Sequence, residues 1–220
     1  MRRAVPAQIV RRALMSLESA LDHEINREKD PRKIAKDFNK IAVRELEKNR
    51  KYEGKNYTLA TSFFGQYLID KKDPSRLLRF DYIGKGCPIV PRDREVSIMA
   101  RALATGQDQN IPNVSRDANH WQCSTEAKAE EVYVRYGLVE EGPFKGFYVA
   151  KGVIDIDFLQ TNVLDKNESM QLSKIFAPYT KLIMPGPPKF EFDPEGNIYI
   201  MSPQEAKLRN IENVENGMAA

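Results

Sequence analysis

The sequence predicts an α+β fold, with helices from both ends of the chain on one face of an antiparallel sheet. Two observations carry this prediction. Segments with helical periodicity lie near the two ends of the chain, and strand-like segments joined by turns fill the middle. Because the terminal helices cover one face of the sheet, the opposite face is left to loops.

The first helix is predicted over Ala7–Ile25, where apolar residues recur at intervals of three and four. Asp30 and Pro31 then supply the N-cap and first residue of a second helix. The first helix either covers the sheet or pairs with a second copy through its near-heptad apolar stripe. The stripe consists of Val10, Leu14, Leu17 and Leu21. We predict a homodimer with the N-terminal helices at its interface, because so apolar a stripe is not left in water.

The middle of the chain is predicted to form five strands and one short helix. Asp93 is the expected N-cap of this helix, and Gly106 is its expected end. The strands are expected at Tyr57–Ile69, Arg76–Ile83, Gln109–Pro112, Glu131–Tyr136 and Phe147–Phe158.

The C-terminal helix is predicted to begin at Asp165, which forms a capping box with Glu168. Its inward residues are expected to be Leu172, Ile175, Phe176, Tyr179 and Leu182, with a kink at Pro178. Residues 189–201 then read as a hairpin. We therefore divide the chain into a helical extension at 1–30, a main domain at 31–184 and a hairpin with a tail at 185–220.

Composition excludes several classes of function. The chain has 34 basic and 31 acidic residues, and this near-balanced charge does not predict a nucleic-acid partner. Two cysteines are too few for a disulfide scaffold or a structural zinc site. No apolar run is long enough to span a bilayer, and no targeting segment is evident. We expect a cytoplasmic protein with no metal and no cofactor.

The strand-like motif GVIDID carries the clearest candidate site. Alternation places Asp155 and Asp157 on one face of the strand, and Ile154, Ile156 and Phe158 on the other. Two carboxylates cannot share a buried face without a cationic partner. The acidic face is therefore either solvated or the wall of a polar pocket, and we predict the pocket.

The succession EVSIMARALATGQDQNIPNVSRD, then GVIDID, then LDKNESMQLSKIFAPYTKLI resembles a GAF domain. The resemblance covers about Lys33 to Met184. It implies an antiparallel sheet with a loop-covered pocket, and a small-molecule-binding sensor or regulatory domain that acts with a partner protein in trans.

Within that family the chain also resembles the free methionine-(R)-sulfoxide reductases, because His120 and Cys123 have the spacing of their catalytic loop. The resemblance implies that Cys123 attacks the sulfoxide and that Cys87 resolves the product as a disulfide. A neighbouring imidazolium would lower the pKa of the Cys123 thiol. The alternative is that both cysteines are ordinary thiols.

The same resemblance assigns ligand-binding roles. Asp155 and Asp157 would hold the amino group of the substrate, assisted by Glu130 or Glu131. Phe63 stands where these enzymes carry a tryptophan, and Ser97 stands at their third cysteine position. The other candidate ligand contacts are Phe63, Tyr67, His120 and Trp121. For His120 and Trp121 a loop-anchoring role is the alternative. A dimerising module with a degenerate pocket is a third alternative function.

Overall fold

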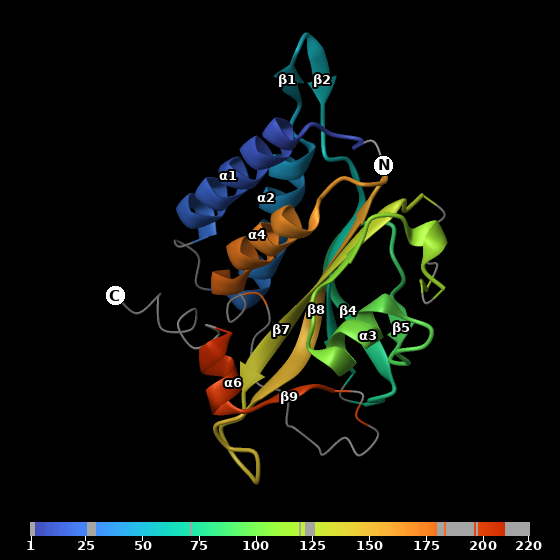
Figure 1. Ribbon diagram of the computed structural model, residues 1–220. Coiled ribbons are helices and arrows are strands. Elements are labelled where there is room, and N and C mark those ends of the chain that lie inside the picture. Colours follow the sequence, from blue (N-terminus) through green and yellow to red (C-terminus); the bar gives the residue numbers. More distant parts are fainter. Residues whose placement is uncertain are drawn as a thin grey trace.

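Alternating apolar residues in the middle of the chain build a seven-stranded sheet in which every strand pair is antiparallel (Figure 1). In this computed structural model the strand order is β5-β4-β3-β8-β7-β6, and β9 pairs with β8. The structure describes residues 3–25, 30–70, 72–118, 120–121, 126–179, 183, 196 and 198–209. The strands of this sheet are β3 (Thr61–Ile69), β4 (Arg76–Gly84), β5 (Ile89–Pro91), β6 (Gln109–Ile111), β7 (Ala129–Leu138), β8 (Tyr148–Phe158) and β9 (Ile200–Met201).

Helices cover the two faces of the sheet unequally. The terminal helices lie on one face and α3 lies on the other, as Figure 1 shows. The helices are α1 (Ala7–Glu24), α2 (Pro31–Glu47), α3 (Ile98–Thr105), α4 (Lys166–Phe176) and α6 (Pro203–Leu208). The predicted α+β architecture, with N- and C-terminal helices on one face of an antiparallel sheet, is confirmed.

The main core lies between the sheet and the terminal helices. The aromatic rings of Phe176 in α4 and Tyr133 in β7 pack edge to face with centroids 5.7 Å apart. Helix α2 lies against β3 and β4, while α1 lies across α2 and α4. The apolar stripe of α1 is wholly buried in this core of the same chain. The homodimer stays a prediction. Because the stripe is buried within its own chain, it no longer supports dimerisation.

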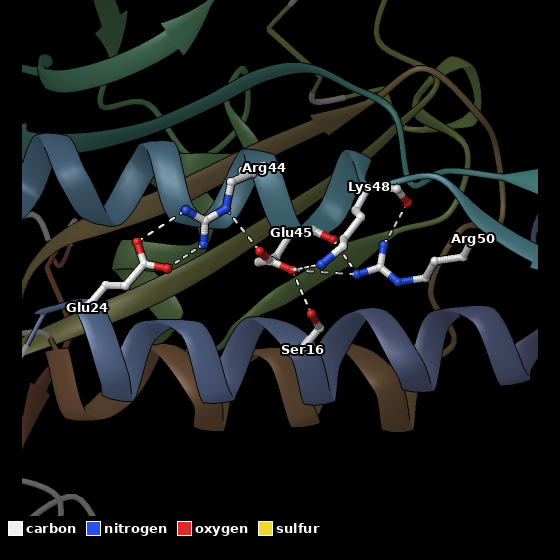
Figure 2. Close-up of polar contacts among 6 residues, drawn as sticks. All are labelled: Ser16, Glu24, Arg44, Glu45, Lys48 and Arg50. Carbon is white, nitrogen blue, oxygen red and sulfur yellow. Dashed lines mark hydrogen bonds and ion pairs between the residues drawn. The ribbon is translucent and has the colours of Figure 1, made fainter.

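A polar network joins α1 to α2 (Figure 2). The Ser16 hydroxyl donates to Glu45 at 2.6 Å, and Arg44 Nε donates to the other carboxylate oxygen of Glu45 at 2.9 Å. Arg44 also pairs with Glu24 of α1 at 2.6 Å. Burial alone would raise the pKa of Glu45, but the hydrogen bonds from Ser16 and Arg44 hold this pKa below its usual value.

Several predicted boundaries differ from the structure. The short helix is capped by Ser97, whose hydroxyl accepts from the Ala100 N–H, and not by Asp93. The Asp93 carboxylate accepts from the Glu95 N–H and so closes a turn before the helix. The sequence before Thr61 forms a separate hairpin, β1 (Arg50–Tyr52) and β2 (Lys55–Tyr57), instead of extending β3.

The C-terminal end agrees with the prediction only in part. The capping box of Asp165 and Glu168 opens α4 as expected, and a 3-10 turn containing Pro178 follows the helix. Leu182 and residues 189–195 lie outside the described residues. The end of the predicted hairpin forms β9 against β8, and α6 was not predicted from the sequence. Among the described residues, no helix has the length and hydropathy of a membrane span.

Candidate functional site

The register of the central strands brings the candidate carboxylates together. Glu130 of β7 lies opposite Asp157 of β8, and the next inward position of β8 on that face is Asp155. On the other side, β3 places Gly65 opposite Asp155. Cross-strand neighbours on one face lie about 4.5–5.5 Å apart at their Cβ atoms, so these carboxylates must meet.

We call Glu130, Asp155 and Asp157 the acidic cluster. One carboxylate oxygen from each lies within 4.8 Å of the others. The three residues are 4%, 3% and 7% exposed, so solvent does little to screen their charges. The Oδ1 atom of Asp155 is buried without a hydrogen-bond partner. A buried acceptor among carboxylates is suited to bind a cationic or hydrogen-bond donor group.

The protonation of the cluster reflects its burial. Burial raises the pKa of Asp157 to about 8, and the negative charge of Glu130 contributes next. Burial also raises the pKa of Asp155 well above its usual value, and the negative charge of Asp157 adds to this. These two shifts favour the protonated forms of Asp155 and Asp157 at neutral pH. A bound cation would displace these protons, because it favours the ionised carboxylates.

His120 joins the acidic cluster from the loop before β7. Its Nδ1 atom lies 2.8 Å from Glu130 Oε2, and its side chain is 13% exposed. The hydrogen bond with Glu130 raises the pKa of His120. Trp121, the next residue, is 43% exposed. The structure thus brings His120 to the cluster and leaves Trp121 at the surface.

Tyr67 and Phe63 connect the acidic cluster to Cys87. The Tyr67 hydroxyl donates to the Cys87 carbonyl at 2.7 Å, and burial followed by the charge of Asp155 raises the pKa of Tyr67. The Phe63 ring lies 5.9 Å from that of Tyr67. Cys87 packs against the same apolar cluster, and its sulfur is in a disulfide bond. Cys123, the predicted nucleophile, lies outside the described residues.

Glu131 points to the opposite face of β7, toward the terminal helices. Its carboxylate accepts hydrogen bonds from Asn110, Ser169 of α4 and Tyr133, the last at 3.1 Å. Burial raises the pKa of Glu131 to about 8. Of the two alternatives left open by the sequence, Glu130 belongs to the acidic cluster and Glu131 does not.

Two departures from the reductase pattern have clear structural settings. Ser97 is buried as the N-cap of α3. The Phe63 ring is buried against two glycines, because a Cβ atom at Gly65 or Gly86 would come within 2.3 or 2.4 Å of it. Both glycines therefore leave room for the ring.

Two residues beside the site, Arg79 and Tyr82, were not predicted from the sequence. The Arg79 guanidinium carbon lies 3.3 Å from the centroid of the Tyr82 ring, which stacks on Phe63 with centroids 6.4 Å apart. No local pattern marks these residues. The glycines around Lys85 were a signal that the chain passes close to another segment, since a Cβ at Gly84 would come within 2.2 Å of the Ser62 carbonyl oxygen.

The acidic cluster can hold a cation of either of two kinds. An ammonium group has three N–H donors, which match the three clustered carboxylates. A calcium ion requires six to eight oxygen ligands, and a magnesium ion requires six, several of them water. The same three residues are therefore the candidate ligands of a metal, but they supply only part of its coordination. The match in number favours an ammonium.

Comparison with known proteins supports the fold. No protein-family model matches the sequence, and no curated protein matches it at a significant level. The free methionine-R-sulfoxide reductase of Neisseria meningitidis, solved with its substrate, is 17% identical with a TM-score of 0.57 over 83% of this chain and 94% of that one. The reduced Staphylococcus aureus enzyme is 19% identical with a TM-score of 0.57, covering 77% of this chain and 94% of its own.

A GAF domain structure is 21% identical with a TM-score of 0.52, covering 80% of this chain and 85% of that one. At these identities the likeness is one of fold. The chain thus has the GAF-like fold that sensor domains and free methionine sulfoxide reductases share, as the sequence predicted.

Proposed function

We propose that the protein binds the ammonium group of a small free amino acid at the acidic cluster, and that it reduces free methionine-(R)-sulfoxide there with its two cysteines. The observation that carries the proposal is the acidic cluster itself. A cation of matching size would stabilise the ionised forms of these three buried carboxyl groups and would supply a partner for Oδ1 of Asp155. A free amino acid supplies one, whereas a residue within a peptide chain has no α-ammonium.

The disulfide of Cys87 supports the redox half of the proposal. Its loop contacts Tyr67, whose pKa responds to all three acids of the cluster. A ligand held by its ammonium in the cluster would thus lie near the cysteine. Because the sequence has only two cysteines, a reductase of this kind would have to pair Cys87 with Cys123.

The proposed reaction has two steps and balances without a cofactor. The Cys123 thiolate attacks the sulfoxide sulfur, oxygen passes to the cysteine, and methionine leaves. The Cys87 thiol then attacks the resulting sulfenic acid, which releases water and forms the disulfide. An external thiol reductant, oxidised to its own disulfide, returns both cysteines to thiols.

A binding-only sensor is the second candidate function. Two observations favour it. Phe63 replaces the tryptophan of the reductases, and Ser97, at their third cysteine position, caps a helix. The ammonium site would serve a sensor equally well. In that case the output would require a partner protein in trans.

The experiment compares turnover with binding. Purified protein is incubated with dithiothreitol and free L-methionine-(R)-sulfoxide, and methionine is quantified by chromatography. We expect turnover by the wild type, none by Cys123→Ser, and none on N-acetyl-methionine sulfoxide, which lacks the ammonium. Binding of L-methionine is measured by calorimetry in parallel. Binding of L-methionine without turnover would support the sensor function over the reductase. If neither binding nor turnover is detected, the proposed ammonium site is wrong.

A further inference from the structure

Hydrogen bonds to three consecutive carbonyl groups hold the loop that carries Cys87 in place. Arg79 Nη1 donates to the Gly86 carbonyl at 2.7 Å, and the Arg79 backbone N–H donates to the Pro88 carbonyl at 3.1 Å. Between them, the Tyr67 hydroxyl donates to the carbonyl of Cys87 itself at 2.7 Å. Arg79 thus holds the residue on each side of the cysteine.

The Arg79 side chain is itself held in place. Its guanidinium carbon lies 3.3 Å from the Tyr82 ring centroid, and Tyr82 stacks on Phe63. The Phe63 ring lies against Gly86, whose carbonyl accepts from Arg79. These contacts form a closed circuit from Arg79 through Tyr82, Phe63 and Gly86 back to Arg79. A guanidinium with a fixed plane loses little further entropy when it donates a hydrogen bond.

We propose that Arg79 is a positioning residue that fixes the backbone of Cys87 for disulfide formation. The proposal rests on the proposed function, in which Cys87 is the resolving thiol. A disulfide forms only when the two Cα atoms lie about 4.4–6.8 Å apart and the Cβ atoms face one another. A cysteine with a fixed backbone meets this requirement more often, so its effective concentration toward the partner sulfur is higher. Arg79 does not touch the sulfur and supplies no proton.

The experiment measures disulfide formation without any sulfoxide. Reduced protein is equilibrated with glutathione, where protein dithiol and oxidised glutathione give protein disulfide and two molecules of reduced glutathione. The protein disulfide fraction is read by mass spectrometry after alkylation. We expect Arg79→Met to lower this equilibrium constant about tenfold. Without the charge-assisted hydrogen bond to Gly86, the loop of the reduced variant samples more conformations and loses more entropy when the disulfide forms. Arg79→Lys keeps a cationic donor but lacks the planar guanidinium, and we expect it to recover part of the loss.

Arg209 provides the matched control. It also donates to a glycine carbonyl, that of Gly106 at 2.9 Å, and its guanidinium carbon lies 5.3 Å from the Tyr199 ring centroid. Arg209→Met should leave the equilibrium constant within about twofold of wild type. An unchanged constant in folded Arg79→Met, or an equal loss in Arg209→Met, would overturn the proposal.

A second variant covers the case in which Arg79→Met does not fold. Tyr82→Leu keeps the guanidinium but removes the ring beneath it, and it should lower the equilibrium constant about threefold. No loss in Tyr82→Leu would then overturn the proposal. Because the glutathione equilibrium involves no sulfoxide, the role of Arg79 can hold even where the wild type shows no turnover. Failure of the proposed function is therefore distinguishable from failure of this inference.

Discussion

Glu130 and Glu131 are neighbours in β7, and both carboxyl groups are buried, but their surroundings are opposite. Glu131 accepts from three neutral donors on the helical face. Glu130 lies among two further carboxylates, with His120 as its hydrogen-bond partner. The fold surrounds Glu131 with donors, whereas Glu130 lies among other acids. We therefore expect Glu131 to contribute to stability and Glu130 to ligand binding.

The largest expected effect concerns Asp157. Asp157→Asn should weaken L-methionine binding by about 3 kcal/mol, on the order of 100-fold, because the ammonium loses a buried charged partner. At pH 8 the variant should be at least as stable as wild type, because burial raises the pKa of the native carboxyl. Calorimetry and thermal denaturation provide the two measurements. Weak binding that merely follows a lower melting temperature would count against a binding role.

The reverse pattern is expected at Glu131. Glu131→Ala leaves the donors of Asn110, Ser169 and Tyr133 without their acceptor, so the free energy of unfolding should fall by about 2 kcal/mol. Binding by the folded variant should stay within about twofold of wild type, because the carboxylate faces away from the acidic cluster. Urea denaturation checks the first value. A large loss of affinity would erase the distinction between the two glutamates.

Changes in pH should separate stability from binding. Native Asp157 and Glu131 keep their protons up to a pKa of about 8, whereas in the unfolded chain they lose them near 4. The unfolding free energy should therefore fall as pH rises from 5 to 8, by up to about 1.4 kcal/mol per pH unit for each group. The unfolding free energy is measured by urea denaturation at each pH. In Glu131→Gln this free energy should fall less steeply with pH, because one of the two titrating groups is gone.

Ligand affinity should change with pH in the opposite direction. An ammonium binds the ionised cluster, so L-methionine affinity should rise up to about tenfold per pH unit toward the Asp157 pKa of about 8 and then level off. Glu131→Gln should leave this profile unchanged, because Glu131 lies on the other face. An affinity that is flat between pH 6 and 8 would mean that no cluster proton is displaced.

The smallest effect is expected at Ser169. Ser169→Ala removes one of the three donors to Glu131, so the unfolding free energy should fall by about 1 kcal/mol. L-Methionine affinity should not change. Chemical denaturation of wild type and variant at pH 7 measures the difference, and a gain in stability would contradict the structural role of the bond.

The sequence predicted what depends on local periodicity. Alternation in β8 separated Asp155 and Asp157 from Ile154 and Ile156, and the structure confirms that separation. The choice between Glu130 and Glu131 depends on the pairing of β7 with β8 and on α4, which no local pattern encodes. The helix cap was misassigned for a related reason, because both Asp93 and Ser97 are good capping residues.

Contacts between distant segments were beyond the reach of sequence patterns. The stripe of α1 predicted an apolar partner correctly, but only the tertiary structure shows that α2 and α4 of the same chain provide it. Arg79 reads as an ordinary strand residue, and its contacts with the loop that carries Cys87 follow from the turn after β4. A sequence period gives the face of a residue, but not its partner.

Counting the protons released on binding tests the distinction between the two glutamates most directly. Titration calorimetry of L-methionine at pH 7, in buffers of different ionisation enthalpy, gives this number. The acidic cluster predicts release of about one proton per ligand by wild type and by Glu131→Gln, because the ammonium displaces a proton held at a pKa of about 8. Binding by the wild type without proton release would contradict this account. Loss of proton release in Glu131→Gln would contradict it as well.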